Sequence, residues 1–274
     1  MTDAQYRGFH IWFKNYVRAG RESDPVDQRN LDLKEEHTDR VGAAMARLTA
    51  ALGLAANGRR LAAVTALFHD LGRFRQYRQY RTFRDADSDN HAKLSLWELN
   101  RHRLLHELDP GERQLIGRAI IFHNRLRLPD HLDPASLLYS RLIRDADKVD
   151  ILRVMAAHFR LPAGQRNPVV TLGLDADGGV RDEVYHRLLA GRIMSYTDLV
   201  STNEFKVLLL GWVFDINFRP TCEMLRETND LGAIAATLPA TPLRKQALDL
   251  INDYLDRCLA GGWRGPLPAR FRHV

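Results

Sequence analysis

A histidine and an aspartate stand side by side at the end of an apolar helical pattern. The pair His69-Asp70 follows a run from Leu61 to Phe68 in which apolar residues recur at helical spacing, and Gly72 is a typical helix stop. Neighbouring helical residues point about 100° apart, so the two side chains reach one point only if it lies between their directions. A metal ion there is one solution. A helix end at which His69 faces the helix dipole and Asp70 caps a loop is the other.

Four more ligand-type residues stand on helical faces that otherwise carry apolar side chains. His37 lies one helical turn before Val41, His91 opens an apolar stripe, His123 closes another, and Asp147 lies within a third. Ionisable side chains are rare on apolar stripes unless they are paired or bound to a metal. The pattern therefore favours a shared site, to which several helices contribute, over isolated helix caps.

In chain order, these six residues resemble the signature of the HD-domain superfamily of metal-dependent phosphohydrolases. The superfamily's histidine, His-Asp pair and final aspartate match His37, His69-Asp70 and Asp147. The additional His91 and His123 resemble the subset that binds two metal ions. The resemblance to this superfamily extends over the surrounding sequence, from about residue 30 to about residue 220.

The resemblance implies an all-α fold, an HD-domain helical bundle with additional C-terminal helices, and two divalent transition-metal ions. By the family pattern, one ion is held by His37, His69, Asp70 and Asp147, and the second by Asp70, His91 and His123. Imidazole and carboxylate ligands without a thiolate suit Mn²⁺, Fe²⁺, Zn²⁺, Co²⁺ or Ni²⁺ and do not choose among them. The expected reaction is hydrolysis of a phosphomonoester or phosphodiester by a metal-activated hydroxide.

Periodicity alone does not choose between Asp145 and Asp147 as the final ligand, because each lies on an apolar stripe of the same expected helix. The choice of Asp147 follows from the resemblance, since the family's aspartate precedes a basic residue, here Lys148. In related nucleotide hydrolases the lysine at this place contacts phosphate, and Arg73 stands where many members have a polar residue facing the substrate. The resemblance thus implies Asp70, Arg73 and Lys148 as catalytic residues. An ordinary surface ion pair is the alternative for the two basic ones.

The segment from Arg73 to Arg84 interleaves five arginines with two phenylalanines and two tyrosines, without a clear helix or strand period. Guanidinium groups bind phosphate oxygens as planar forks, and aromatic rings can stack on a base. We therefore expect a substrate-binding loop; a solvated loop anchored by its aromatic rings is the alternative. The predicted substrate contacts are Arg73, Arg75, Arg78, Tyr80, Arg81 and Lys148.

Composition limits the class of protein and of partner. Hydrophobic residues make up 45% of the 274 residues, which allows a large core, and the net charge of +6 favours anionic partners. We expect a small phosphorylated substrate, possibly a nucleotide, with nucleic acid as a further candidate. No apolar run approaches a membrane span, no signal peptide is evident, and the two cysteines suit a reduced compartment. These features predict a cytoplasmic protein without a membrane partner, and they leave the oligomeric state open.

Helical patterns and breakers predict one all-helical domain over residues 1–274, with a core at about 30–160 and a C-terminal helical extension at about 181–260. A short hairpin or a loop is expected around residues 169–180. The expected helices span about 3–19, 31–54, 59–71, 91–108, 112–123, 135–158, 181–191, 203–219, 220–228 and 242–259.

Two other functions share these sequence features. Some HD-fold proteins use the same six ligands to hold two irons, which activate O₂ and oxidise a phosphonate or a polyol. A non-catalytic module that binds nucleotides or nucleic acid is the other alternative. Among hydrolases, the cyclic-di-GMP group is not favoured, because Asn124 follows His123 and the group's Gly-Tyr-Pro signature is absent.

Overall fold

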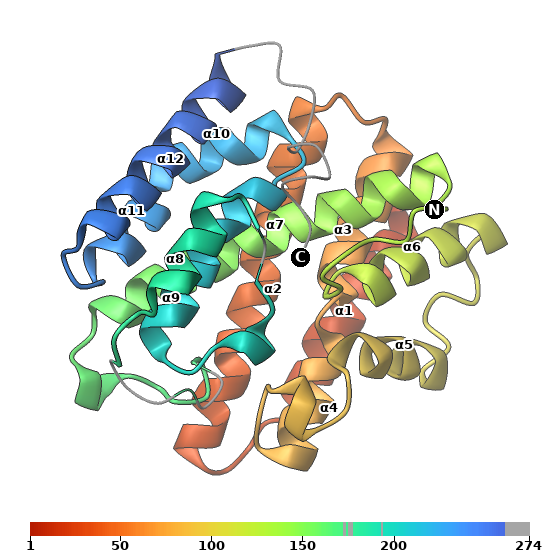
Figure 1. Ribbon diagram of the computed structural model, residues 1–274. Coiled ribbons are helices and arrows are strands. Elements are labelled where there is room, and N and C mark those ends of the chain that lie inside the picture. The colour runs from red at the N-terminus through yellow and green to blue at the C-terminus, as the bar shows by residue number, and fades with distance from the viewer. Residues whose placement is uncertain (172–173, 175–177, 193, 261–274) are drawn as a thin grey trace. The chain divides into compact units, whose positions relative to one another are not determined.

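The computed structural model describes residues 1–171, 174, 178–192 and 194–260 (Figure 1). Over these residues the chain forms α-helices and short 3₁₀ helices and no strand, so the predicted all-α class is confirmed. The middle of the predicted hairpin or loop lies outside the described residues. Within the described part, no helix combines the length and the apolar character needed to cross a membrane.

The chain forms two compact units, residues 1–150 and 151–274, and the boundary falls inside a long helix. The first unit contains α1 (Asp3–Ala19), α2 (Pro25–Ala51), α3 (Ala56–Phe68), α4 (Leu71–Tyr80), α5 (His91–Arg101), α6 (Pro110–Phe122) and most of α7 (Pro134–Arg160). The second contains the end of α7 and then α8 (Asp182–Leu189), α9 (Thr202–Gly211), α10 (Arg219–Thr228), α11 (Asp230–Ala236) and α12 (Pro242–Leu259). The organisation as one domain stays a prediction.

Local capping chemistry sets several helix starts of the first unit. α2 begins at Pro25, about two turns earlier than expected, because the Asp24 side chain accepts hydrogen bonds from the Val26 and Asp27 amides. Proline has no amide hydrogen to lose at the first helical position, so the Asp24-Pro25 pair starts this helix. The Asp109 side chain and Pro110 start α6 in the same way.

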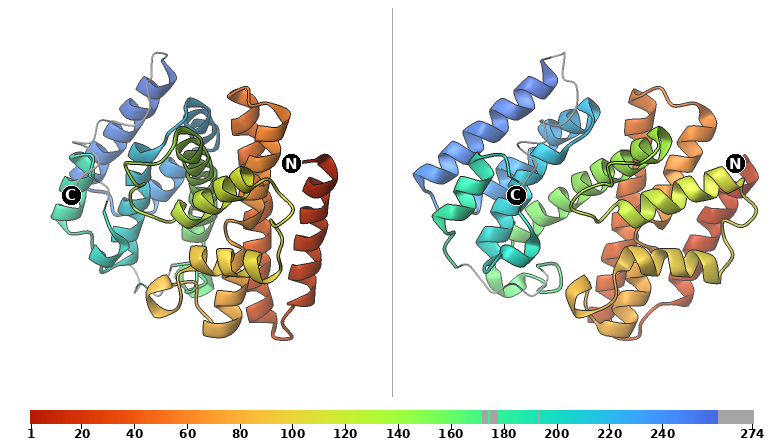
Figure 2. Two further views of the ribbon diagram at one scale, coloured as in Figure 1. Left: turned by 90° about the vertical axis from the view of Figure 1, so that its right-hand side faces the viewer. Right: turned by 45° about the vertical axis from the view of Figure 1, so that its right-hand side comes forward.

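Helix α3 is the centre of the first unit. It packs against α1, α2 and α6, while α4 packs against α2 and α5 (Figure 2). The side chains of Ala62, Val64, Ala66 and Phe68 are fully buried. A helix buried on several sides holds its last turn firmly, so the residues that follow Phe68 start from a fixed position.

The loop expected after Gly72 is instead helix α4, which starts at Leu71 directly after the His-Asp pair. A β-carbon at Gly72 would lie 2.2 Å from the His91 carbonyl oxygen and 2.5 Å from the Ser95 nitrogen. Its amide donates a 2.8 Å hydrogen bond to the Ser95 hydroxyl. Gly72 therefore lets the backbones of α4 and α5 approach closely and does not stop a helix, which is why the helix-stop expectation was wrong.

Candidate metal centre

The six predicted ligands converge in the first unit. Three overlapping groups each have their ligand atoms within 4.8 Å of one another. The groups are His37, His69 and Asp70; His69, His123 and Asp147; and Asp70, His91 and His123. The four histidines and Asp70 are buried, and Asp147 is partly exposed.

Helix ends supply most of these side chains. His37 lies in the middle of α2, while His69 and Asp70 form the turn between α3 and α4. His91 is the first residue of α5, and His123 is the cap residue at the end of α6. Because helix ends meet at one place, residues far apart in the sequence are held within reach of one ion.

The first half of the cluster comprises His37, His69 and Asp147, together with the Oδ2 atom of Asp70. The Nε2 atom of His37 lies 3.1 Å from Asp147 Oδ1 and 3.7 Å from Asp70 Oδ2. The Nε2 atoms of His37 and His69 are 3.3 Å apart. Two imidazole nitrogens and two carboxylates thus surround one point.

The second half comprises His91 and His123, together with the Oδ1 atom of Asp70. The two Nε2 atoms lie 3.1 Å apart, at 3.5 Å and 3.7 Å respectively from Asp70 Oδ1. The two oxygens of Asp70 therefore face different halves, which is the arrangement expected of a carboxylate that bridges two ions.

Each histidine is oriented through its Nδ1 atom. Main-chain carbonyl oxygens hold His69 (from Ala66, 2.8 Å) and His123 (from Ile120, 2.6 Å). Carboxylates hold the other two: Asp150 binds His37 at 2.7 Å and Asp85 binds His91 at 2.8 Å. These acceptors assign the proton of the neutral ring to Nδ1, so Nε2 presents its lone pair to the cluster.

This donor set fits divalent transition metals. Four Nε2 lone pairs and two carboxylates point at one another, with nitrogen pairs only 3.1–3.3 Å apart. Facing lone pairs repel unless a cation lies between them, and ligating histidines commonly have Nδ1 held by a carboxylate or a carbonyl. A site with nitrogen and oxygen ligands and no thiolate does not favour soft metals.

Two positive side chains border Asp70. Lys34 Nζ donates a 2.9 Å hydrogen bond to Asp70 Oδ2, and Arg73 Nε lies 3.5 Å from Oδ1. Burial alone would raise the pKa of Asp70, but the charges of Lys34, His69 and Arg73 together outweigh burial and hold this pKa well below its usual range. Asp70 is therefore a charged carboxylate with one oxygen toward each half of the cluster.

Sequence reasoning missed Lys34, Asp85 and Asp150. Lys34 lies three residues before His37, and Asp150 three residues after Asp147, so helical spacing could have found both. Asp85 lies in a turn that folds back onto His91, where no periodicity applies. Its carboxylate also accepts from Gln76 Nε2 at 2.8 Å and from Arg73 Nη1 at 3.2 Å.

The two halves differ in proton affinity. Burial would lower the pKa of His37, but its hydrogen bonds to Asp147 and Asp150 outweigh burial and raise that pKa. Burial, reinforced by the nearby Arg73 charge, lowers the pKa of His91 to about 4. In the metal-free protein a proton therefore binds the first half more readily than the second.

Asp147 presents its carboxylate to the cluster, at 3.1 Å from His37 and 3.7 Å from His69. Asp145 is fully buried, and in the described part of the chain it belongs to none of the three ligand groups. Asp147 is thus the aspartate of this pair that lies beside His37 and His69. Its role as a metal ligand stays a prediction.

The predicted substrate residues do not share one surface. The Arg73 guanidinium is bound to the Phe83 carbonyl and Asp85 beside the cluster, and Lys148 is buried next to Asp147 in α7. The Tyr80 hydroxyl donates to Asp89 at 2.7 Å. Arg81 forms ion pairs with Glu22 and Asp27 at 3.2 Å and 3.0 Å.

Arg75 and Arg78 belong to another neighbourhood. Arg75 lies over the Trp97 ring and pairs with Glu98, while Arg78 lies over the Tyr16 ring. None of these partners is a member of the histidine–aspartate cluster. The substrate-binding roles of all six residues stay predictions.

Comparison with protein-family models gives a match to the HD domain over residues 35–152. The matched range contains all six residues of the cluster, and also Asp85 and Asp150. Comparisons with curated proteins and with solved structures gave no match.

Proposed function

We propose, on the premise that this chain is a member of the HD-domain superfamily of metal-dependent hydrolases, that it is a phosphohydrolase that holds two divalent ions. The observation that carries the proposal is the division of Asp70 between two sets of inward-facing histidines. A mononuclear site would need only the first half of the cluster. The buried pair of His91 and His123, 3.1 Å apart at Nε2, has no other evident use in the described structure.

Under this proposal His37, His69, Asp70 and Asp147 hold one ion, and Asp70, His91 and His123 hold the other. Bound divalent ions would supply Lewis acidity toward a phosphoryl group and would acidify a water molecule near neutral pH. Asp150 and Asp85 keep the Nε2 lone pairs of His37 and His91 directed inward. A carboxylate oxygen has two lone pairs, so Asp70 Oδ2 can accept from Lys34 and also bind an ion.

The proposed substrate is a small phosphorylated molecule such as a nucleotide, and nucleic acid is a further candidate. The net charge of +6 supports an anion. Lys148 and Arg73 adjoin the ligands Asp147 and Asp70, so they are the candidates for contacting the phosphoryl group. Arg73 already binds Asp85 and the Phe83 carbonyl, so it also positions the turn that holds His91.

The test combines metal analysis with activity on the same samples. The full chain is purified with and without air, its metal content is measured, and a panel of phosphomonoesters and phosphodiesters is assayed before and after chelation. We expect hydrolysis of at least one of these esters without O₂, its loss on chelation, and its return with two equivalents of a divalent transition metal. Turnover that depends strictly on O₂, with a mixed-valence iron signal in the EPR spectrum, would assign the site to the di-iron oxygenases instead.

A further inference from the structure

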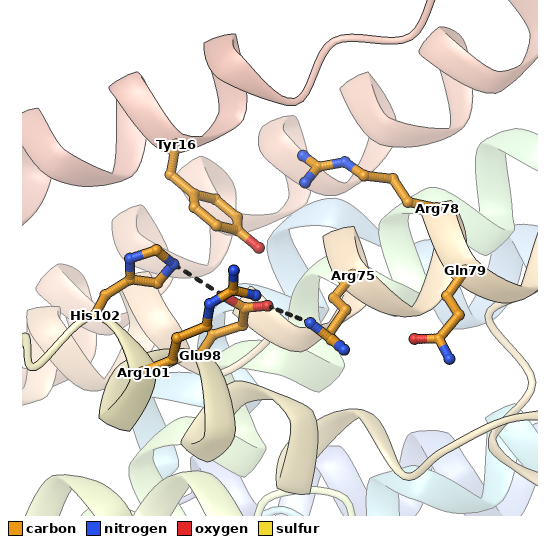
Figure 3. Close-up of a pocket in the computed structure, with 7 residues that line it drawn as sticks. All are labelled: Tyr16, Arg75, Arg78, Gln79, Glu98, Arg101 and His102. Atoms are coloured by element: carbon orange, nitrogen blue, oxygen red, sulfur yellow. Dashed lines mark hydrogen bonds and ion pairs between the residues drawn. The ribbon is translucent and has the colours of Figure 1, made fainter.

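A pocket of about 460 Å³ lies in the first unit, between side chains of α1, α4 and α5 (Figure 3). Its lining includes Arg75 and Arg78 from α4, Glu98 and Arg101 from α5, and Tyr16 from α1. None of these residues belongs to the histidine–aspartate cluster. Pockets of this size hold small molecules, commonly oriented by a few polar groups.

Helix α4 divides its arginines between two neighbourhoods. Residues three apart on a helix lie on one side, so Arg75 and Arg78 share a face, whereas Arg73 lies nearly opposite Arg75. Accordingly, Arg73 contacts Asp70 and Asp85, while the other two point into the pocket of Figure 3. The pocket is therefore a feature separate from the candidate metal centre.

The pocket has more positive than negative charge. Its carboxylate, Glu98, is buried and already has two basic neighbours: Arg75 Nη1 at 3.5 Å and His102 Nε2 at 3.2 Å. Arg78 and Arg101 form no ion pair with a carboxylate of the described residues. Each lies over an aromatic ring instead, Arg78 over Tyr16 at 5.5 Å and Arg101 over Trp97 at 5.1 Å. Among the described residues, these two guanidinium groups have no carboxylate partner, and both line the pocket.

The donors of Arg78 are also incompletely used. Its Nε and Nη2 atoms are buried and have no hydrogen-bond partner in the described structure. Buried donors without a partner are uncommon, and each carries a desolvation cost that an acceptor would remove. Nη2 packs against Gly20 at the end of α1, so these donors would reach an anion only if the guanidinium turned toward the pocket.

The Tyr16 hydroxyl adds a neutral donor. Burial, together with the nearby Glu98 carboxylate, raises the pKa of Tyr16 to about 12, so the hydroxyl keeps its proton at physiological pH. In Figure 3 the ring reaches from α1 into the space bordered by the arginines. A ligand there would meet guanidinium forks and a hydroxyl from three helices.

We propose that this pocket binds a phosphoryl group, with Arg78 and Arg101 as its principal partners and Arg75 and Tyr16 as further donors. A phosphoryl group carries up to two charges and three free oxygens, and guanidinium forks from two helices can bind different oxygens at once. The source is either free phosphate or the phosphate of a larger metabolite. The site is additional to the proposed metal-dependent hydrolysis and requires no metal.

Calorimetric titration of the chelator-treated full chain tests the proposal without a contribution from bound metal ions. The probes are inorganic phosphate, pyrophosphate and a nucleoside triphosphate. We expect at least one to bind, and Arg78→Ala or Arg101→Ala to weaken it roughly tenfold to a hundredfold, because each removes charge-assisted hydrogen bonds. The probe that binds most tightly identifies the source. Lys93→Ala is the matched control: it removes an exposed positive charge from α5.

A second variant changes the pocket without changing its charge. A β-carbon at Gly20 would lie 1.6 Å from Arg78 Nη2, so Gly20→Ala must displace that guanidinium. Gly20 has φ −103°, which alanine adopts without strain. We expect Gly20→Ala to change the affinity for the bound probe while the melting temperature stays near that of the wild type. Affinities of Arg78→Ala, Arg101→Ala and Gly20→Ala that match the Lys93→Ala control, or no binding of any probe at millimolar concentration, would overturn the proposal.

Discussion

In the first half of the cluster His37 lies between two carboxylates, whereas in the second half His91 lies near two carboxylates and the Arg73 guanidinium. His37 contacts Asp147 and Asp150, and its pKa is raised despite burial. His91 contacts Asp85 and Asp70, but burial and Arg73 lower its pKa to about 4. The two halves of the cluster therefore differ in proton affinity, although their residue types are similar, because the charges around them differ.

This difference has a consequence for metal binding. Histidine ligands must be deprotonated before they bind, so a proton competes with the metal at the first half near neutral pH. At the second half the imidazole of His91 is already neutral, so no proton has to leave. Metal binding there is opposed instead by repulsion from the positive charge of Arg73. The two halves should thus respond differently to pH and to substitution, although Asp70 links them.

Asp70→Ala should have the largest effect, because it removes a carboxylate whose two oxygens face different halves. We expect loss of both ions and of all phosphohydrolase turnover, measured by elemental analysis and a phosphate-release assay. Asp39→Ala, at an exposed carboxylate that pairs with Lys14 on the surface, is the control and should behave as the wild type. Wild-type metal content in Asp70→Ala would mean that the halves do not share a ligand.

Substitution of a ligand in one half should reduce binding of the ion proposed for that half and leave the other ion bound. His37→Ala should reduce occupancy of the first ion, and His91→Ala that of the second, because each removes an Nε2 ligand from one half only. Metal titration of each variant should give about one equivalent, compared with two for the wild type. If both variants still bind two equivalents of metal, or if neither variant binds any metal, the division into halves is wrong.

The carboxylates that orient the histidines should matter less than the ligands. Asp150→Asn and Asp85→Asn keep the shape but remove the negative charge behind His37 and His91 respectively. Changes at such partners typically weaken metal binding by about tenfold to a hundredfold. Competition with a fluorescent chelator measures each affinity. Asp87→Asn, at an exposed carboxylate beside Asp85, should leave the metal affinity of both halves unchanged. An equal loss of metal affinity in this control would indicate a general charge effect.

The smallest expected effect is on the pH dependence of stability in the metal-free protein. The pKa of His91 falls from 6.5 to about 4 on folding, so the unfolded chain binds more protons, and stability decreases as the pH drops from 6.5 toward 4. The pKa of His37 is raised on folding, so its contribution is complete below pH 6.5 and is lost as the pH rises through the folded value.

Melting temperatures across this range test both signs. His91→Gln should reduce the loss of stability on the acid side, and His37→Gln should reduce the loss on the alkaline side. His158, whose pKa is also lowered to about 4 by burial, contributes equally in all three proteins and cancels in the comparison. Identical pH profiles for the wild type and both variants would contradict the proposed asymmetry.

The fold class and the residue types of the cluster could be predicted from the sequence. Histidines and aspartates on apolar stripes are costly unless they share a site, and helical periodicity shows which side of a helix each one occupies. The same periodicity predicted most helices within a few residues. It also missed α11 and misread Gly72 and the helix that follows it, because close backbone approach has no local signature.

Tertiary structure alone decided which side chains meet. Periodicity fixes the face of a helix but not the helix that it faces, so Asp145 and Asp147 were equivalent until α7 was placed against α2. The same reason hid the acceptor behind His91, since Asp85 lies in a turn to which no helical period applies. It also hid the division of the arginines of α4 between the cluster and the pocket. In each case the deciding quantity is a distance between elements, which depends on packing and not on local sequence.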